Sequence, residues 1–195
     1  IKYARKSKYK TKIMVITDTS LIDINKKYTY ADYLCWQVKD RLELIKGRLF
    51  KMSPAPTSYH QKLSSRLHIE IGNYLKRKNC EIFHAPFDVR LPKNNNETAD
   101  QLIDTRGCLG SPDLIIEILS SKTAPKDLNE KFHLYEECGV VEYWIVYPGE
   151  NILEVFIANQ EQKYVLSGKY IRQDIVESSV IAGLKVELKD IFDEI

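Results

Sequence analysis

The sequence lacks the features that mark membrane-spanning, secreted or zinc-finger proteins. No apolar run approaches the about 20 residues of a membrane-spanning helix, and no apolar signal segment lies near the N-terminus. The four cysteines, Cys35, Cys80, Cys108 and Cys138, have neither the CxxC nor the Cys–His spacing of a zinc site. We therefore expect free thiols in a reducing compartment, and a cytoplasmic protein with no membrane contact.

The chain also lacks a strong net charge. With 29 Lys and Arg against 27 Asp and Glu, its net charge is +2, which does not by itself indicate a nucleic-acid binder. The first twelve residues contain no acid and six basic side chains: Lys2, Arg5, Lys6, Lys8, Lys10 and Lys12. This arm is either a solvated tail or a phosphate-contacting segment. We assign residues 1–27 to a basic N-terminal extension and residues 28–195 to a single domain, which is long enough to bury a core.

Hydrophobic periodicity predicts helices and strands in a mixed order. Thr29 is a candidate cap for a short helix, and Lys46-Gly47 for the turn of a hairpin over residues 42–52. Thr57 or Ser58 can cap an amphipathic helix. The further expected elements are helices over 59–78 and 126–138, strands over 81–91 and 140–148, and shorter segments over 152–158, 163–166 and 186–192. The polar segment 93–111 contains no convincing strand.

The most informative stretch runs from Ser111 to Ser120 and reads Ser-Pro-Asp-Leu-Ile-Ile-Glu-Ile-Leu-Ser. Its apolar character predicts a buried strand. Because strand side chains alternate, Asp113 and Glu117 belong to the same face. An ionised carboxylate inside a sheet costs several kcal/mol unless a cation, a metal ion or hydrogen bonds compensate it. Glu117 is therefore a candidate functional acid.

Lys131 lies on the apolar stripe of the helix expected over 126–138. Either its stem covers the core while its ammonium stays in water, or the ammonium meets Glu117. The second interpretation predicts that the two side chains lie within reach of a hydrogen bond or one water molecule. Phosphodiester hydrolysis uses such groups: carboxylates hold Mg²⁺, and a lysine orients or deprotonates the water bound to the metal.

Asp113 and Glu117 are too far apart along a regular strand to bind one ion directly. Residues four apart on a strand are separated by about 13 Å, whereas the ligands of Mg²⁺ lie about 2.1 Å from the metal. A second acid must therefore come from elsewhere, unless Pro112 bends the strand and brings Asp113 inward. Asp113 is equally a candidate turn or end-capping residue. The other candidate acids are Asp88, Asp100 and Asp104.

Several short motifs follow one another along the chain. They are Glu43-Leu44-Ile45-x-Gly47, Met52-Ser53-Pro54-Ala55-Pro56 leading to His60, Pro112 to Ser120, Asp127 with Lys131 and Tyr135, and Gly139-Val140-x-Glu142-Tyr143-Trp144-Ile145-Val146. Together they resemble the Uma-type domains of unknown function, over about residues 28–192.

This family is placed in the PD-(D/E)XK restriction endonuclease-like superfamily. The resemblance implies an α/β (α+β) fold, with a mixed sheet flanked by helices, and a nuclease site that uses Mg²⁺ or Mn²⁺ on DNA. It implies that Glu117 is the strand acid and that Lys131 is the superfamily lysine, moved to the helix from the strand position of Leu119. The candidate catalytic residues are then Asp113, Glu117 and Lys131, and the candidate metal ligands are Asp113 and Glu117.

The chain departs from the family pattern at one point. Members usually carry an additional Pro-Asp strand just before this one, which supplies the first acid, and here the short segment 97–110 takes its place. We therefore expect Glu117 to hold a metal ion weakly, and cleavage to be weak or absent. His60 matches the loop-helix motif of the family and is either a group near the phosphate or a core or capping histidine.

The expected function is Mg²⁺-dependent hydrolysis of DNA phosphodiester bonds by an endonuclease with an incomplete active site. The alternative is a catalytically inactive DNA- or protein-binding module on the same scaffold. A homodimer is compatible with both. Binding of a divalent metal ion would distinguish the endonuclease from the inactive module.

Overall fold

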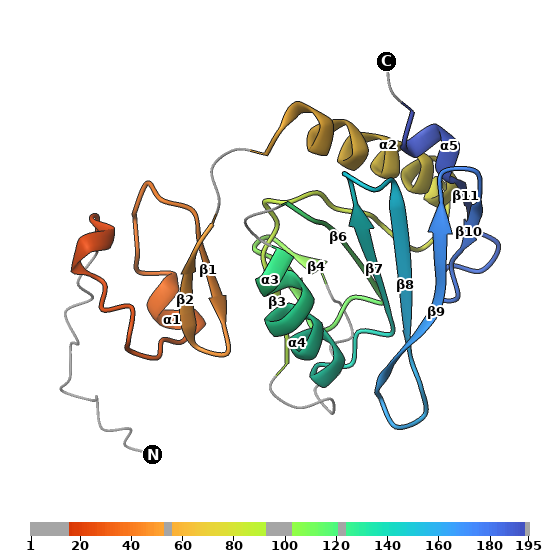
Figure 1. The fold of residues 1–195 in the computed structure, drawn as a ribbon. Coiled ribbons are helices and arrows are strands. Elements are labelled where there is room, and N and C mark those ends of the chain that lie inside the picture. Colours follow the sequence, from red (N-terminus) through yellow and green to blue (C-terminus); the bar gives the residue numbers. More distant parts are fainter. Residues whose placement is uncertain (1–15, 53–55, 93–102, 121–123, 194–195) are drawn as a thin grey trace. The chain divides into compact units, whose positions relative to one another are not determined.

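A computed structural model describes residues 16–52, 56–92, 103–120 and 124–193 (Figure 1). The chain divides into two compact units, residues 1–52 and residues 53–195, and each is described by itself. The basic residues 2–12 lie outside the described residues. Within the described residues, no helix is long and apolar enough to cross a membrane, and Cys35, Cys80, Cys108 and Cys138 are all free thiols.

The first unit contains two short helices and a hairpin. Thr29 and Asp32 form a reciprocal capping box at the start of the second helix, as the sequence predicted for Thr29. Lys46 and Gly47 have φ values of 49° and 81°, so the hairpin closes through a two-residue turn with both residues left-handed. The elements are η1 (Thr19–Leu21), α1 (Tyr30–Tyr33), β1 (Leu42–Ile45) and β2 (Arg48–Lys51).

The second unit is built on a four-stranded mixed sheet of order β6-β7-β8-β9 (Figure 1). Its strands are β6 (Leu114–Ile118), β7 (Glu142–Tyr147), β8 (Ile152–Ala158) and β9 (Tyr164–Ile171). β6 runs parallel to β7, and the other neighbours are antiparallel. A helical crossover joins the two parallel strands, as parallel pairing requires. It consists of α3 (Ala124–Lys126), the π-helix η2 (Asp127–Lys131) and α4 (Phe132–Glu137).

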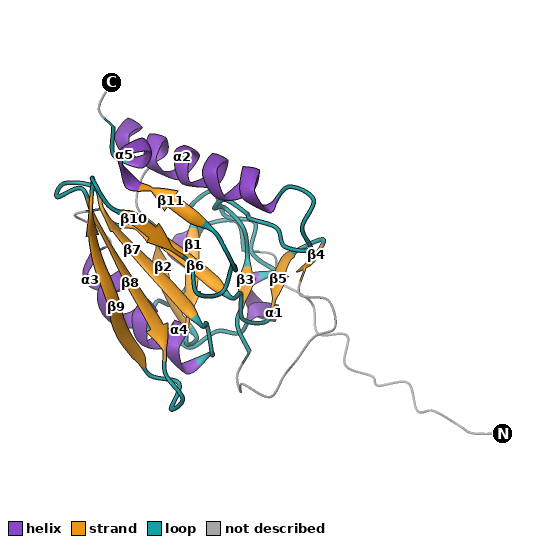
Figure 2. Ribbon diagram, turned by 90° about the vertical axis from the view of Figure 1, so that its right-hand side faces the viewer, coloured by secondary structure: helices purple, strands orange, loops and turns teal. Residues whose placement is uncertain are grey.

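Helices cover both faces of this sheet (Figures 1 and 2). One face packs against α2 (Ser58–Leu75), α5 (Leu188–Ile191) and the small sheet of β10 (Ile175–Glu177) and β11 (Lys185–Glu187). Ile116 and Ile118 belong to this core, together with the buried Leu63 and Leu67 of α2. Ile115 belongs to the second core, which contains the crossover helices. This alternation confirms the expected strand, but its residues are only partly buried, because β6 lies at the edge of the described sheet. Thr57 caps α2 by accepting from the His60 amide.

The segment before β6 differs from the expectation. The strand expected over 81–91 is reduced to β3 (Val89–Arg90), because its earlier part makes loop contacts with α2, including one between Ser64 and His84. Two strands form where none was expected: β4 (Ile103–Asp104) and β5 (Gly107–Leu109). Gly107 has φ 127°, and a side chain there would collide with the carbonyl of Asp88. β9 and β10 likewise extend beyond the sequence prediction.

Glu136 of α4 ties the crossover to β9. Its carboxylate accepts hydrogen bonds from Lys163 Nζ at 2.9 Å and from the backbone amide of Tyr164 at 2.8 Å. Burial acts to raise the pKa of Glu136, but these two hydrogen bonds outweigh burial and hold the pKa below its usual value.

We expect Glu136 to make the free energy of unfolding depend on acid pH. A lowered folded-state pKa contributes stability that is complete above the usual value of 4.5 and is lost as pH falls through the folded pKa. Glu136→Gln should therefore be less stable than the wild type at neutral pH, and the difference should shrink as pH falls below 4.5. Urea unfolding over a pH series measures it. A difference that stays constant into this acid range would contradict the assignment.

Candidate active site

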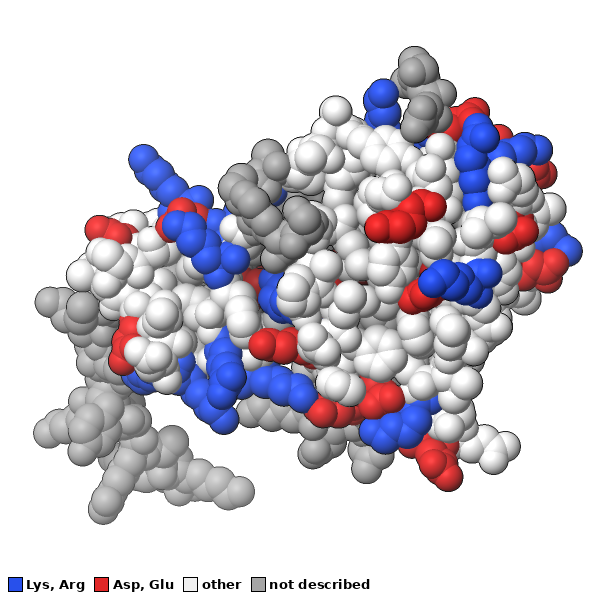
Figure 3. All heavy atoms as spheres, in the orientation of Figure 1, with Lys and Arg blue, Asp and Glu red and all other residues white. Residues whose placement is uncertain are grey.

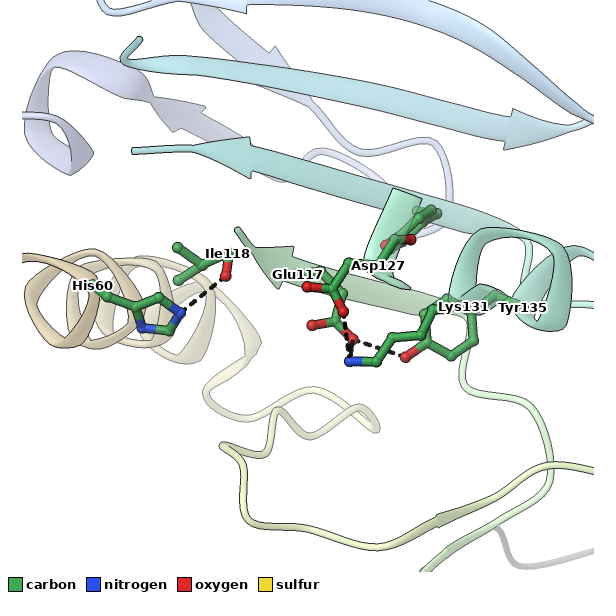
Figure 4. A network of polar contacts seen from close by, with 7 residues as sticks. His60, Glu117, Ile118, Asp127, Lys131 and Tyr135 are labelled. Atoms are coloured by element: carbon green, nitrogen blue, oxygen red, sulfur yellow. Dashed lines mark hydrogen bonds and ion pairs between the residues drawn. The ribbon is translucent and has the colours of Figure 1, made fainter. Parts of the chain in front are cut away.

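Glu117 stands near the C-terminal end of β6 and is the centre of a polar cluster (Figure 4). Its side chain is 22% exposed. Lys131 Nζ donates to Glu117 Oε1 at 2.8 Å, and the Tyr135 hydroxyl donates to the same oxygen at 2.8 Å. The predicted meeting of Lys131 and Glu117 is confirmed, and Lys131, at 11% side-chain exposure, does not extend into bulk water.

Asp127 is the second carboxylate of the cluster. It is 1% exposed, and its Oδ1 lies 3.0 Å from Lys131 Nζ. Asp127 and Lys131 are the first and last residues of the π-helix η2, a distortion that is often found at functional positions. The crossover therefore presents one ammonium group to two carboxylates that come from different elements (Figure 4).

Sequence reasoning assigned no site role to Asp127 or Tyr135. The spacing contained the signal, because residues 127, 131 and 135 follow one another at intervals of four and therefore share one face of a helix. Tyr143 lies on the neighbouring strand and donates through its hydroxyl to the backbone oxygen of Asp127 at 3.4 Å. Burial, followed by the charges of Glu117 and Asp127, raises the pKa of Tyr143, so that this hydroxyl remains protonated.

Asp113 lies just before β6 and its side chain is exposed. Its backbone oxygen accepts from the Glu142 amide at 3.0 Å, and the polar contacts of Glu117 do not include it. Asp104 of β4 pairs with Arg90 of β3, and Asp88 is exposed just before β3. Asp100 lies outside the described residues.

His60 lies in the first turn of α2, beside the end of β6. Its Nε2 lies 2.9 Å from the carbonyl oxygen of Ile118, the neighbour of Glu117 in sequence. Since a carbonyl only accepts, Nε2 carries the proton. Nδ1 is buried and finds no hydrogen-bond partner among the described residues. Figure 4 shows the ring directed at this backbone oxygen.

The cluster does not fit a divalent metal ion as it is arranged. Carboxylate oxygens are suitable ligands for Mg²⁺, but Glu117 and Asp127 both direct an oxygen at the ammonium of Lys131. Among the described residues, no group of three or more His, Cys, Asp or Glu side chains converges as a metal site would.

The mixed sheet, its parallel crossover and the acid–lysine pair define a restriction endonuclease-like domain. Residues 30–189 match the model of the family described as "Uma2: Putative restriction endonuclease". The match spans more than half of the chain, so the chain belongs to the Uma2 family.

Two known proteins resemble the chain. "Uncharacterized protein slr1290" of Synechocystis sp. is 22% identical over 151 residues, which cover 72% of this chain and 79% of that protein. A crystal structure described as "a putative nuclease belonging to DUF820" from Anabaena variabilis ATCC 29413 has a TM-score of 0.62 and 20% identity, over 85% of this chain and 97% of that chain. This likeness confirms the restriction endonuclease-like fold.

Proposed function

We propose that this chain is a DNA endonuclease of the Mg²⁺-dependent kind whose metal site is incomplete, so that it cleaves phosphodiester bonds weakly or not at all. The ion pair between Glu117 and Lys131 is the observation that supports a nuclease-type site. A bound Mg²⁺ would supply a more acidic water and neutralise charge that develops on the phosphate. Asp113 stays a proposed second ligand, although its exposed side chain makes none of the polar contacts of Glu117.

In the proposed reaction, Lys131 supplies positive charge, and Tyr135 and Asp127 hold the charged side chains in position. Lys131 presents an ammonium that can pair with a phosphate oxygen and stabilise its negative charge. Tyr135 donates to Glu117 Oε1, and so acts as a positioning residue for this carboxylate. Lys131 is itself positioned by Asp127, from the start of the same π-helix.

A DNA-binding module without catalysis is the second candidate. It is favoured by the pairing of Lys131 with both carboxylates, because the ammonium contacts the oxygens that a divalent cation would need. The face of the second unit seen in Figure 3 intersperses basic and acidic side chains. DNA affinity should therefore depend on a few local phosphate contacts and fall only modestly with salt, because the salt dependence scales with the number of phosphates that the protein contacts. Binding of a protein and not of DNA would identify a protein partner instead.

Incubation with plasmid and short duplex DNA in Mg²⁺ or Mn²⁺ tests the proposal, with Glu117→Ala and Lys131→Ala as matched variants. We expect weak cleavage, and its loss in both variants, because each removes one partner of the ion pair. Cleavage that neither variant changes would remove this site from consideration. Robust cleavage that Glu117→Ala abolishes would mean that another acid completes the site. DNA binding without cleavage would identify the inactive module.

The same proposal includes a homodimer and a cytoplasmic location. Duplex DNA has two strands, and a two-fold dimer presents one site to each of them. Sedimentation of the free protein measures the oligomeric state, and a monomer at all concentrations would remove this part of the proposal.

A further inference from the structure

We propose that the Lys131 ammonium is the resident cation of a two-carboxylate site, and that it excludes divalent metal ions from the position between Glu117 and Asp127. The inference deepens the proposed function and rests on it for its biological meaning. Its physical content is a competition between two cations for the same pair of oxygens.

The carboxylates of Glu117 and Asp127 both lie close to the Lys131 ammonium. Lys131 Nζ is 2.8 Å from Glu117 Oε1 and 3.0 Å from Asp127 Oδ1. A metal ion such as Mg²⁺ takes carboxylate oxygens at about 2.1 Å, so each oxygen would need to approach by less than about 1 Å to bind a metal ion at the position of Nζ. The two acids belong to different elements, β6 and the crossover, and the lysine holds them together.

The surroundings of Asp127 Oδ1 also favour a cation site. This oxygen is buried, and in the described part of the chain no hydrogen bond reaches it, although the Lys131 ammonium faces it at 3.0 Å. A buried carboxylate oxygen without a hydrogen bond is costly, and a cation that satisfied it better would be favoured.

Charge explains why one cation excludes the other. Two carboxylates and one ammonium leave a net charge of about −1 in the cluster, and loss of the ammonium leaves two uncompensated acids in a largely buried place. Carboxylate oxygens are suitable ligands for hard cations such as Mg²⁺ and Mn²⁺. Removal of the Lys131 charge should therefore open a hard-cation site.

The experiment is titration of the full chain with Mn²⁺, followed by the electron paramagnetic resonance signal of the free ion. Lys131→Met keeps an unbranched side chain that ends one atom before the position of Nζ and removes the charge, and Lys131→Arg keeps the charge. Lys163→Met is the matched control, because Lys163 pairs at 2.9 Å with a single buried carboxylate, that of Glu136. The double variant Lys131→Met with Asp127→Asn removes the second ligand.

We expect Lys131→Met to bind one Mn²⁺ at least about tenfold more tightly than the wild type, because the buried acids then have no other cation. Lys131→Arg and Lys163→Met should bind like the wild type, and Asp127→Asn should abolish the gain. A Lys131→Met variant that binds no more tightly, or a gain that survives Asp127→Asn, would overturn the inference.

Folding supplies a second readout. If Lys131→Met is unfolded in metal-free buffer, Mn²⁺ should restore its far-ultraviolet circular dichroism, since a ligand that binds only the folded state stabilises it. Failure of Mn²⁺ to restore it would also overturn the inference. Neither readout uses DNA, so the two proposals can fail separately. If the wild type never cuts DNA but Lys131→Met binds Mn²⁺ more tightly, only the proposed function is refuted. If the wild type cuts DNA but Lys131→Met binds Mn²⁺ no more tightly, only the inference is refuted.

Discussion

Replacement of Glu142 by alanine should destabilise the second unit by about 4 kcal/mol, because several buried donors would lose one charged acceptor together. Glu142 is fully buried on β7. Its Oε1 accepts from Trp144 Nε1, and its Oε2 accepts from the amide of Ser179 at 2.8 Å. The other donors to Oε2 are the Ser178 and Ser179 hydroxyls and the Val180 amide. One carboxylate therefore anchors the connection between β10 and β11 to the central sheet.

Urea unfolding measures this loss. Ser179→Ala is the matched control, since it removes one hydroxyl donor and leaves the carboxylate, and it should cost about 1 kcal/mol. Glu142→Gln should fall between the two, because it keeps the shape and replaces one acceptor by a donor. A Glu142→Ala protein within about 1 kcal/mol of the wild type would show that the loop donors find other partners.

The largest gain of function is expected from restoring the Pro-Asp strand that family members usually carry in the place of segment 97–110. In the part of the chain that the structure describes, β6 is an edge strand and pairs only with β7, so a further strand can add beside Glu117. A third carboxylate there would bring the net charge of the cluster to about −2, which a divalent cation neutralises beside Lys131. Cleavage in Mg²⁺ should rise on the order of a hundredfold, the size of effect that one well-placed charged group commonly has.

Local rules predicted those elements whose signals lie within a few residues. The Thr29 cap, the Lys46-Gly47 turn and the helix that begins after Thr57 follow from capping and turn chemistry. The two faces of β6 follow from alternation, and the contact between Glu117 and Lys131 follows because each side chain interrupts an apolar surface.

Elements and side chains whose position depends on contacts with distant residues could not be predicted in this way. β4 and β5 are too short to show a periodicity, and they form because Arg90 pairs with Asp104 and because Gly107 passes close to the backbone of Asp88. The spacing of Asp127, Lys131 and Tyr135 places them on one helix face, but it does not show that the carboxylate of Asp127 is buried. Its position depends on the π-helix, which no local propensity indicates.

The measurement that tests the central claim most directly is the rate of plasmid cleavage by the strand-restored chain in Mg²⁺, with and without Glu117→Ala. Unfolding midpoints of the two proteins serve as the folding control. The account predicts measurable cleavage by the restored chain and a fall to background when Glu117 is removed, because we propose Glu117 as the strand acid of the site. Cleavage that continues undiminished without Glu117 would contradict the account.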